Sequence, residues 1–351
     1  MYRISLSFLS GVMLACGLIF GVAEAQELNR DWDIVGKEMK IINEESPYAV
    51  SIFTDTGSGS GFVFKNAQGK WELLTNNHVV GGAATIWVQF YKEEIFHKVA
   101  VLGRDPSLDL ALAEISFPLP LNIVSAQLGQ TRNLKVGDRV YALGNPFGVR
   151  SVSVGWVNAL GSAFSPLFFS SQTPIHSGNS GGAMFRFNEK GLREVIGMNT
   201  AIIKPGLSSS TLAFTTHIDY IKKILPRLRA ERVVEHAFVG ADFEDIKKIP
   251  PPLFEKITNA PYPPREFGVM VAQVVPGSPA AQSNLQPGDL IVEMKYRNTV
   301  IPFSDAQSLW ERIFFDFRPQ QELVLTTKRG EHTLVRSVIL GVLPPPSPRN
   351  E

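Results

Sequence analysis

The segment Gly178-Asn179-Ser180-Gly181-Gly182 places a single serine hydroxyl among three glycines. Glycine lets the backbone turn tightly, and a tight turn can direct neighbouring N–H groups at a developing oxyanion. A serine hydroxyl is a weak nucleophile unless an adjacent base takes its proton as it attacks. Because a glycine-rich pentapeptide can also be an ordinary loop, its interpretation depends on the rest of the chain.

Two upstream segments carry the groups that such a serine needs. Residues 74–80 read LTNNHVV, and residues 105–111 read DPSLDLA. A neutral histidine can accept the serine proton near neutral pH, and a buried carboxylate fixes the histidine tautomer. Each segment alone is also typical of a strand end or a turn. Together they provide an imidazole and a carboxylate, in that order, before the serine.

The chain order is His78, Asp109, Ser180. Chymotrypsin-type double barrels use this order, whereas subtilisins and α/β-hydrolases use others. We therefore predict a serine protease with these three residues as its catalytic triad. The backbone N–H groups of Gly178 and Ser180, with Asn179 between them, are the predicted oxyanion hole.

The surrounding sequence has the pattern of a mainly β protein. From about residue 47 to residue 214, short apolar alternations such as Ile86, Val88 and Phe90 are broken by turn residues. This predicts a barrel or a sandwich and not βαβ units. Apolar residues then recur at helical spacing in a predicted helix, at Ile218, Ile221, Ile224, Leu225 and Leu228.

Composition excludes several other functions. The 351 residues carry a formal net charge of +1 and no run of basic residues, so nucleic-acid binding is not expected. Cys16 is the only cysteine, which argues against disulfides and thiolate metal sites. No histidine pair has the spacing of a metal-binding motif. We expect neither a metal nor a cofactor.

The N-terminus resembles an export signal. Arg3 precedes an apolar stretch from Ile4 to Val22, and Ala23-Glu24-Ala25 suits signal peptidase. Cleavage after residue 25 would release an exported, periplasmic protein. An uncleaved inner-membrane anchor is the main alternative, and a lipoprotein anchored through Cys16 would have a poor recognition sequence.

The motifs resemble those of the HtrA/Deg family of exported, trypsin-like proteases. The matching stretches are residues 57–62, 75–80, 144–148, 153–155, 178–182 and 195–201. The resemblance implies a chymotrypsin-like pair of perpendicular six-stranded barrels over residues 47–228, with the triad in the cleft between them. It also implies a homotrimer built through this domain, for which residues 26–46 are the place to look.

The segment before the nucleophile departs from the family pattern. His176 and Ser177 replace the usual Asn-Pro, and Gln172 replaces an aspartate, which leaves open whether the oxyanion hole is formed at rest. Pro174 takes the place at the base of the S1 pocket, so the resemblance implies cleavage after small or medium apolar residues. Thr200 and Ala201 would lie along the substrate backbone.

Residues 238–340 resemble a PDZ domain, a small α+β unit, after a linker at 229–237 and before a Pro-rich tail at 341–351. Val239, Gly240 and Ala241 match the loop that binds a peptide carboxylate. Ser278 is the predicted N-cap of a short helix with Pro279 at its first position. A capping box at residues 304–307 predicts a second helix.

The resemblance implies an endoprotease of protein quality control and the stress response. It would cleave unfolded exported proteins and would be regulated by C-terminal peptides at the PDZ domain. Two alternatives remain: a peptide-binding chaperone or regulator with a dormant protease domain, and a second domain used only for packing.

Overall fold

The computed structural model describes residues 48–145, 150–161, 166–176, 178–203, 212–258, 261–262 and 268–344. The predicted signal, the N-terminal segment to residue 46 and most of the Pro-rich tail lie outside these ranges. Within them, no helix is both long and apolar enough to cross a membrane. The same ranges contain no cluster of side chains suited to a metal ion.

The first barrel is a sheet in the order β5-β4-β1-β2-β3-β7-β6. Only Val99 separates β5 from β6, so one bent strand pairs with β4 through its first half and with β7 through its second. This bend joins the two ends of the sheet, which explains how seven segments form the predicted six-stranded ring. The strands are β1 (Ala49–Thr54), β2 (Ser58–Lys65), β3 (Trp71–Thr75), β4 (Ile86–Phe90), β5 (Phe96–Lys98), β6 (Ala100–Asp105) and β7 (Leu110–Glu114).

The apolar residues at alternate positions, which predicted β4, are the buried residues of that strand. Ile86, Val88 and Phe90 are buried, whereas Trp87, which lies between the first two, is 40% exposed. Successive side chains of a strand point to opposite faces, so one face of β4 joins the barrel core.

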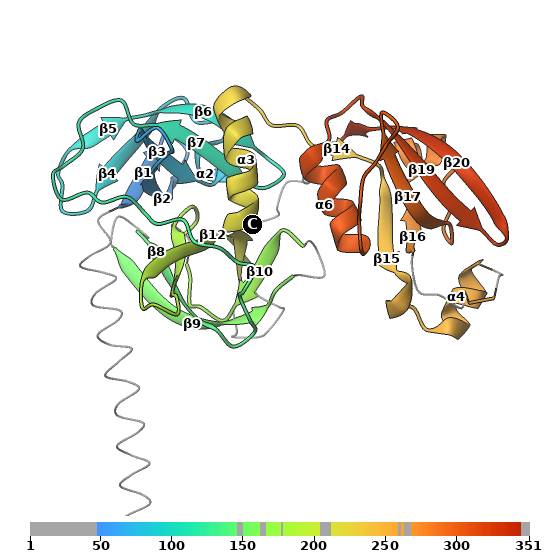
Figure 1. Cartoon of the computed structure of the whole chain (residues 1–351). Helices are drawn as coiled ribbons and strands as arrows, with labels where there is room; N and C mark the ends of the chain where they lie inside the picture. Colours follow the sequence, from blue (N-terminus) through green and yellow to red (C-terminus); the bar gives the residue numbers. More distant parts are fainter. Residues whose placement is uncertain are drawn as a thin grey trace, which may run out of the picture.

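The second barrel is closed, in the order β10-β13-β12-β11-β8-β9. Figure 1 shows it below the first barrel, with helix α3 (Ile218–Ala230) beside both. The helix contacts β6 and β7 of one barrel and β12 and β13 of the other. The strands are β8 (Arg139–Gly144), β9 (Ser151–Ala159), β10 (Phe168–Ser171), β11 (Ala183–Phe187), β12 (Arg193–Ile203) and β13 (Leu212–His217).

Helix α3 buries the apolar face that the sequence predicted, including Ile221, Ile224 and Leu228. It approaches β6 so closely that a Cβ on Gly103 would lie 2.1 Å from the Leu228 carbonyl oxygen. The helix also continues through Ala230, beyond the predicted start of the linker at residue 229.

The C-terminal unit has a main sheet in the order β15-β16-β17-β19-β20, with β18 on β17, and a separate β14–β21 pair. Its strands are β14 (Ala237–Phe238), β15 (Ala241–Asp245), β16 (Val269–Val274), β17 (Leu290–Tyr296), β18 (Thr299–Val300), β19 (Glu322–Arg329), β20 (His332–Ile339) and β21 (Gly341–Val342). Its helices are η2 (Ile246–Lys248), α4 (Pro251–Thr258), α5 (Pro279–Gln282) and α6 (Ala306–Asp316). Leu309 and Ile313 of α6 enter the core of this unit.

The helix caps agree with the sequence in one case and differ in the other. Ser278 caps α5, and its Oγ accepts a hydrogen bond from the Ala281 N–H at 3.3 Å. For α6 the predicted capping box was one residue too early. Asp305 is the N-cap because its carboxylate accepts from the Ser308 N–H at 2.7 Å, a bond that Ser304 does not make.

Side chains of helix α6 contact side chains of α3. Phe315 of α6 stacks on Tyr220 of α3 with ring centroids 5.0 Å apart. Phe314 and Phe315 belong to the same buried cluster as the core of the first barrel. The two units therefore share a hydrophobic interface in addition to the linker.

His217, the residue before α3, should make the fold sensitive to acid. Its ring lies between Phe169 and Tyr220, at 5.1 and 5.4 Å, and burial lowers its pKa to about 4. The native state therefore excludes a proton that the unfolded chain binds as the pH falls below about 6.5. The contribution of His217 to the free energy of unfolding is fully present above about pH 6.5 and is lost as the pH falls towards 4.

We predict that the wild type loses about 2 to 3 kcal/mol of unfolding free energy between about pH 7 and about pH 4.5 through this group. A His217→Gln variant should lack that part of the loss. Urea unfolding of both proteins at the two pH values measures it. An equal loss in the two proteins would show that His217 is not responsible.

Candidate active site

His78 and Asp109 form a close pair at the edge of the first barrel. The His78 Nδ1 lies 2.6 Å from the Asp109 Oδ2, and the His78 backbone N–H donates to the Asp109 Oδ1 at 2.9 Å. The Asp109 side chain is 9% exposed, while the His78 side chain is 41% exposed. With Nδ1 donating to the carboxylate, Nε2 remains able to accept a proton.

The backbone around Asp109 is held by the segment that precedes His78. Asp109 has a left-handed conformation, with φ 55°, which is uncommon for residues other than glycine. Its carbonyl oxygen accepts from the Asn76 Nδ2 at 2.8 Å and from the Asn77 N–H at 3.1 Å. Helix α2 (Asn77–Val80) thus fixes both the backbone and the carboxylate of Asp109.

The Ser180 loop packs onto β2 and the end of β3. The Ser60 N–H donates to the Ser180 carbonyl oxygen at 2.8 Å. A Cβ on Gly181 would lie 2.4 Å from the Thr75 Oγ1 and 3.1 Å from the Asn76 nitrogen. The loop that carries the serine therefore lies against the strand that leads into α2.

Gly59 lies between the two loops. A Cβ on this residue would be 2.7 Å from the Val79 methyl groups and 3.2 Å from the Ser180 carbonyl oxygen. Val79 and the Ser180 carbonyl oxygen thus both lie beside Gly59 of β2. Within the described ranges no hydrogen bond joins the Ser180 hydroxyl to the His78 ring, and such bonds often tighten only when substrate binds.

The N–H groups of the Ser180 loop divide into two sets. Asn179, Gly181 and Gly182 donate to carbonyl oxygens, at 3.0, 2.8 and 3.0 Å. The N–H groups of Gly178 and Ser180 donate to no acceptor among the described residues.

The conformation of Gly178 suits such a pair of donors. Its φ is 95°, the left-handed value that glycine adopts readily. Its carbonyl oxygen accepts from the Ser60 Oγ, which also accepts from the Asn145 N–H at 2.8 Å. The Gly178 carbonyl is thereby engaged within the protein.

The predicted pocket residues lie in different environments. Pro174 is exposed. The Thr200 side chain is buried, donates to the Met198 carbonyl oxygen at 3.0 Å and lies 3.4 Å from the Asn76 Nδ2. Only the backbone of Thr200 is therefore available to a substrate, and the side chain of Ala201 lies outside the described part of the chain.

Sequence reasoning missed the supporting roles of Gly59, Ser60 and Asn76. Gly59 and Ser60 were part of a matched motif, but nothing in the sequence indicated that they touch the Ser180 loop. Asn76 lies within the histidine motif, yet its bond to the Asp109 carbonyl joins residues 33 positions apart.

The predicted carboxylate loop of the C-terminal unit also has two available donors. The carbonyl oxygens of Val239 and Gly240 accept from Ala280 at 2.8 Å and Val275 at 2.9 Å. The N–H groups of the same two residues donate to no acceptor within the described ranges. Gly240 has φ 78°, and Ala241 begins β15.

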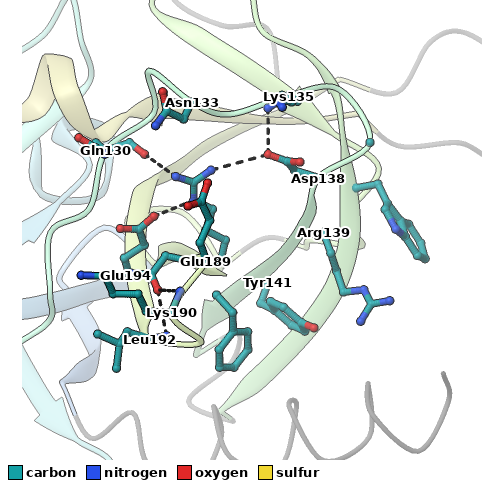
Figure 2. Close-up of a pocket in the computed structure, with 15 residues that line it drawn as sticks. Gln130, Asn133, Lys135, Asp138, Arg139, Tyr141, Glu189, Lys190, Leu192 and Glu194 are labelled. Carbon is teal, nitrogen blue, oxygen red and sulfur yellow. Dashed lines mark hydrogen bonds and ion pairs between the residues drawn. The ribbon is translucent and has the colours of Figure 1, made fainter. Parts of the chain in front are cut away.

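A cavity of about 800 Å³ on the second barrel lies outside this site. Figure 2 shows Gln130, Asp138 and Glu194 directed at one guanidinium group, which belongs to Arg186. The Arg186 Nε donates to Glu194 at 2.7 Å, so its charge is compensated within the protein. None of the three predicted triad residues lines this cavity.

Comparison with known proteins shows the domains and the family of this chain. Residues 59–198 match the trypsin-like peptidase domain and residues 237–340 match the PDZ domain. The serine protease HhoB of Synechocystis sp. is 31% identical over 83% of this chain and 68% of its own length. This chain belongs to the HtrA/Deg family of serine proteases. The predicted mainly β fold, the PDZ domain and the serine-type endopeptidase class are confirmed.

Other relatives agree with this assignment. The periplasmic serine endoprotease DegP of Salmonella typhimurium is 32% identical over 67% of this chain, which spans 48% of DegP. A solved structure of the HtrA-type protease AlgW with a tripeptide has a TM-score of 0.66 and 27% identity. The match covers 88% of this chain and 98% of that chain.

The contacts of Gly59 predict that the activity of this endopeptidase is sensitive to a side chain at this position of β2. We expect Gly59→Ala to lower kcat roughly tenfold to hundredfold, because the added methyl group must displace Val79 or the Ser180 carbonyl. Gly57→Ala is the matched control, since a Cβ there meets nothing within 4 Å. Peptide-substrate kinetics and urea unfolding of both variants measure the effect. Equal kcat values for the two folded variants would contradict it.

Proposed function

We propose that this endopeptidase uses His78, Asp109 and Ser180 as a catalytic triad in the quality control of exported proteins. The observation that carries the assignment is the 2.6 Å contact between the His78 Nδ1 and the Asp109 Oδ2. It leaves Nε2 able to act as the base on a ring that is 41% exposed. The next residue, Val79, and the Ser180 carbonyl oxygen both lie beside Gly59.

The mechanism follows from these contacts. The His78 Nε2 takes the proton of the Ser180 hydroxyl as its oxygen attacks the peptide carbonyl. Asp109 stabilises the imidazolium, and the backbone N–H groups of Gly178 and Ser180 bind the developing oxyanion. The imidazolium then protonates the departing amine. Water next attacks the acyl-enzyme carbonyl while His78 takes its proton, and the imidazolium returns a proton to Ser180 as the acid product leaves.

The resting conformation of the Ser180 loop supports a formed oxyanion hole. The two N–H groups assigned to the hole are those without an acceptor among the described residues. The Ser60 hydroxyl keeps the Gly178 carbonyl engaged. The predicted base of the S1 pocket is Pro174 and not a carboxylate. This supports cleavage after apolar residues, which unfolded proteins expose.

The PDZ domain is proposed to bind peptide C-termini. The N–H groups of Val239 and Gly240 are two free donors at a left-handed glycine, and such a nest of N–H groups suits a carboxylate. The AlgW structures are described with a bound tripeptide and decapeptide, which supports the same use here. Export to the periplasm is proposed on the relatives named as periplasmic and on the N-terminal sequence. A homotrimer is proposed on the family resemblance alone.

A dormant protease that only binds peptides is the second candidate. It is favoured by the lack of a described hydrogen bond between Ser180 and His78. A fluorophosphonate probe separates the two candidates, because it labels a serine only when the serine is activated. We expect the mature chain to be labelled and Ser180→Ala not to be. If no labelling occurs even with C-terminal peptides present, the binding role is the correct one.

Asp109→Asn tests the role of the carboxylate. The amide would hold His78 in the wrong tautomer, so we expect kcat to fall by about 10⁴. The Asp138→Asn variant is a control, because Asp138 is a carboxylate of the second barrel outside the site. Turnover of a peptide substrate within tenfold of wild type in Asp109→Asn would rule out the assigned triad.

Peptide binding is tested by changing only the peptide terminus. We expect a peptide with an apolar, free C-terminus to bind at least about tenfold more tightly than its C-terminal amide, because the amide loses the charge that the N–H groups hold. Calorimetry on Ser180→Ala avoids cleavage during the measurement. Equal affinities would mean that residues 239–241 do not bind the carboxylate.

A further inference from the structure

His236 is a buried histidine between the two units of the protein, outside the active site. Its side chain and that of Asp105 are both 0% exposed. The His236 Nε2 lies 2.7 Å from the Asp105 Oδ2, and its Nδ1 lies 3.0 Å from the Phe314 carbonyl oxygen. The ring also stacks on the Phe314 ring, with centroids 3.7 Å apart.

Both partners of this imidazole are hydrogen-bond acceptors. A neutral imidazole donates from only one nitrogen, so it cannot satisfy a carboxylate and a carbonyl oxygen together. Two hydrogens must lie in this group, either on His236 as an imidazolium or shared with Asp105. In both cases the docked state holds one proton more than a neutral histidine beside an ionised aspartate.

The two acceptors belong to different functional parts. Asp105 begins the turn that ends at Asp109, and its Oδ1 accepts from the N–H groups of Ser107 and Leu108 at 3.1 and 3.0 Å. Phe314 belongs to α6, whose first residue donates to Asp245 of β15. One ring thus joins the turn that ends at Asp109 to helix α6, which contacts β15, the strand that follows the predicted carboxylate loop.

We propose that His236 is a protonated latch that holds the PDZ domain on the protease domain and couples peptide binding to the Asp109 turn. The docking part stands on the contacts alone, whereas the coupling part rests on the proposed function. Because docking retains a proton, it weakens as the pH rises and the latch loses that proton.

The other groups at this interface do not share this behaviour. Glu231 is bonded to Arg227, which lowers its pKa, and lies 3.7 Å from Arg318 of the PDZ domain. Burial raises the pKa of Tyr220, whose hydroxyl donates to Glu311 at 2.7 Å.

Two further groups complete the surroundings. Burial lowers the pKa of His217 to about 4, so that ring is neutral in neutral buffer. Lys223 pairs with Glu311 at 3.3 Å. The His236–Asp105 pair is therefore the group whose variants test the pH dependence of docking.

Hydrogen exchange of the full mature chain, carrying Ser180→Ala, measures docking. The reporters are the Val234 N–H, which donates to Arg104, and the Leu343 N–H, which donates to His236. We expect their protection factors to fall as the pH rises in the parent protein. In His236→Gln they should be about tenfold lower or more at every pH, because one buried acceptor loses its donor.

Asp105→Asn is the decisive variant. Its amide can donate to a neutral His236 while the Nδ1–H still donates to Phe314, so both bonds persist without the extra proton. We expect protection that no longer varies with pH. Glu311→Gln is the matched control, since it weakens the same interface without touching the latch and should keep the pH dependence. The docking proposal is wrong if Asp105→Asn titrates like the parent.

Coupling is measured separately on chains with an intact Ser180. The readout is the ratio of kcat/KM with a saturating C-terminal peptide to that without it. This ratio should move to one in His236→Gln and remain at its wild-type value in His332→Gln, an exposed histidine of β20. An unchanged ratio in His236→Gln would overturn the coupling. If the wild type shows no peptide response, the proposed regulation fails while the exchange result still decides docking.

Discussion

The paired bonds between Asp109 and α2 are the constraint on which the site depends. One carboxylate oxygen binds the His78 ring, the other binds the His78 backbone, and the Asp109 carbonyl binds Asn76 and Asn77. The turn can make all these contacts because Asp109 adopts a left-handed conformation. Buried hydrogen bonds of this kind repay the strain and fix a single orientation of the imidazole.

The remaining architecture brings the Ser180 loop against the strand that leads to His78. Ser180 comes from the second barrel, but its loop is bound by Ser60 of the first. Glycines at positions 59 and 181 allow the two backbones to approach within distances that a side chain would prevent. Helix α3 then covers both barrels and presents the surface on which the PDZ helix α6 packs.

Local patterns predicted several elements well and others with small errors. The alternation of β4 and the apolar face of α3 each reflect burial on one side, so periodicity was a sufficient signal. The start of α6 was one residue off because neighbouring polar residues, Ser304 and Asp305, can both cap a helix. Thr200 was predicted to lie along the substrate backbone, and the structure adds that its side chain is buried against Asn76.

The sequence by itself determined the family and the serine-endopeptidase class: the residue types, their order and the glycines around Ser180 need no coordinates to be recognised. It also determined the fold class, because alternating burial is written in the local pattern. Only the tertiary structure decided which residues support the site and that His236 lies between two acceptors. Such contacts join positions 131 and 78 residues apart, and no local periodicity records which distant groups folding will bring together.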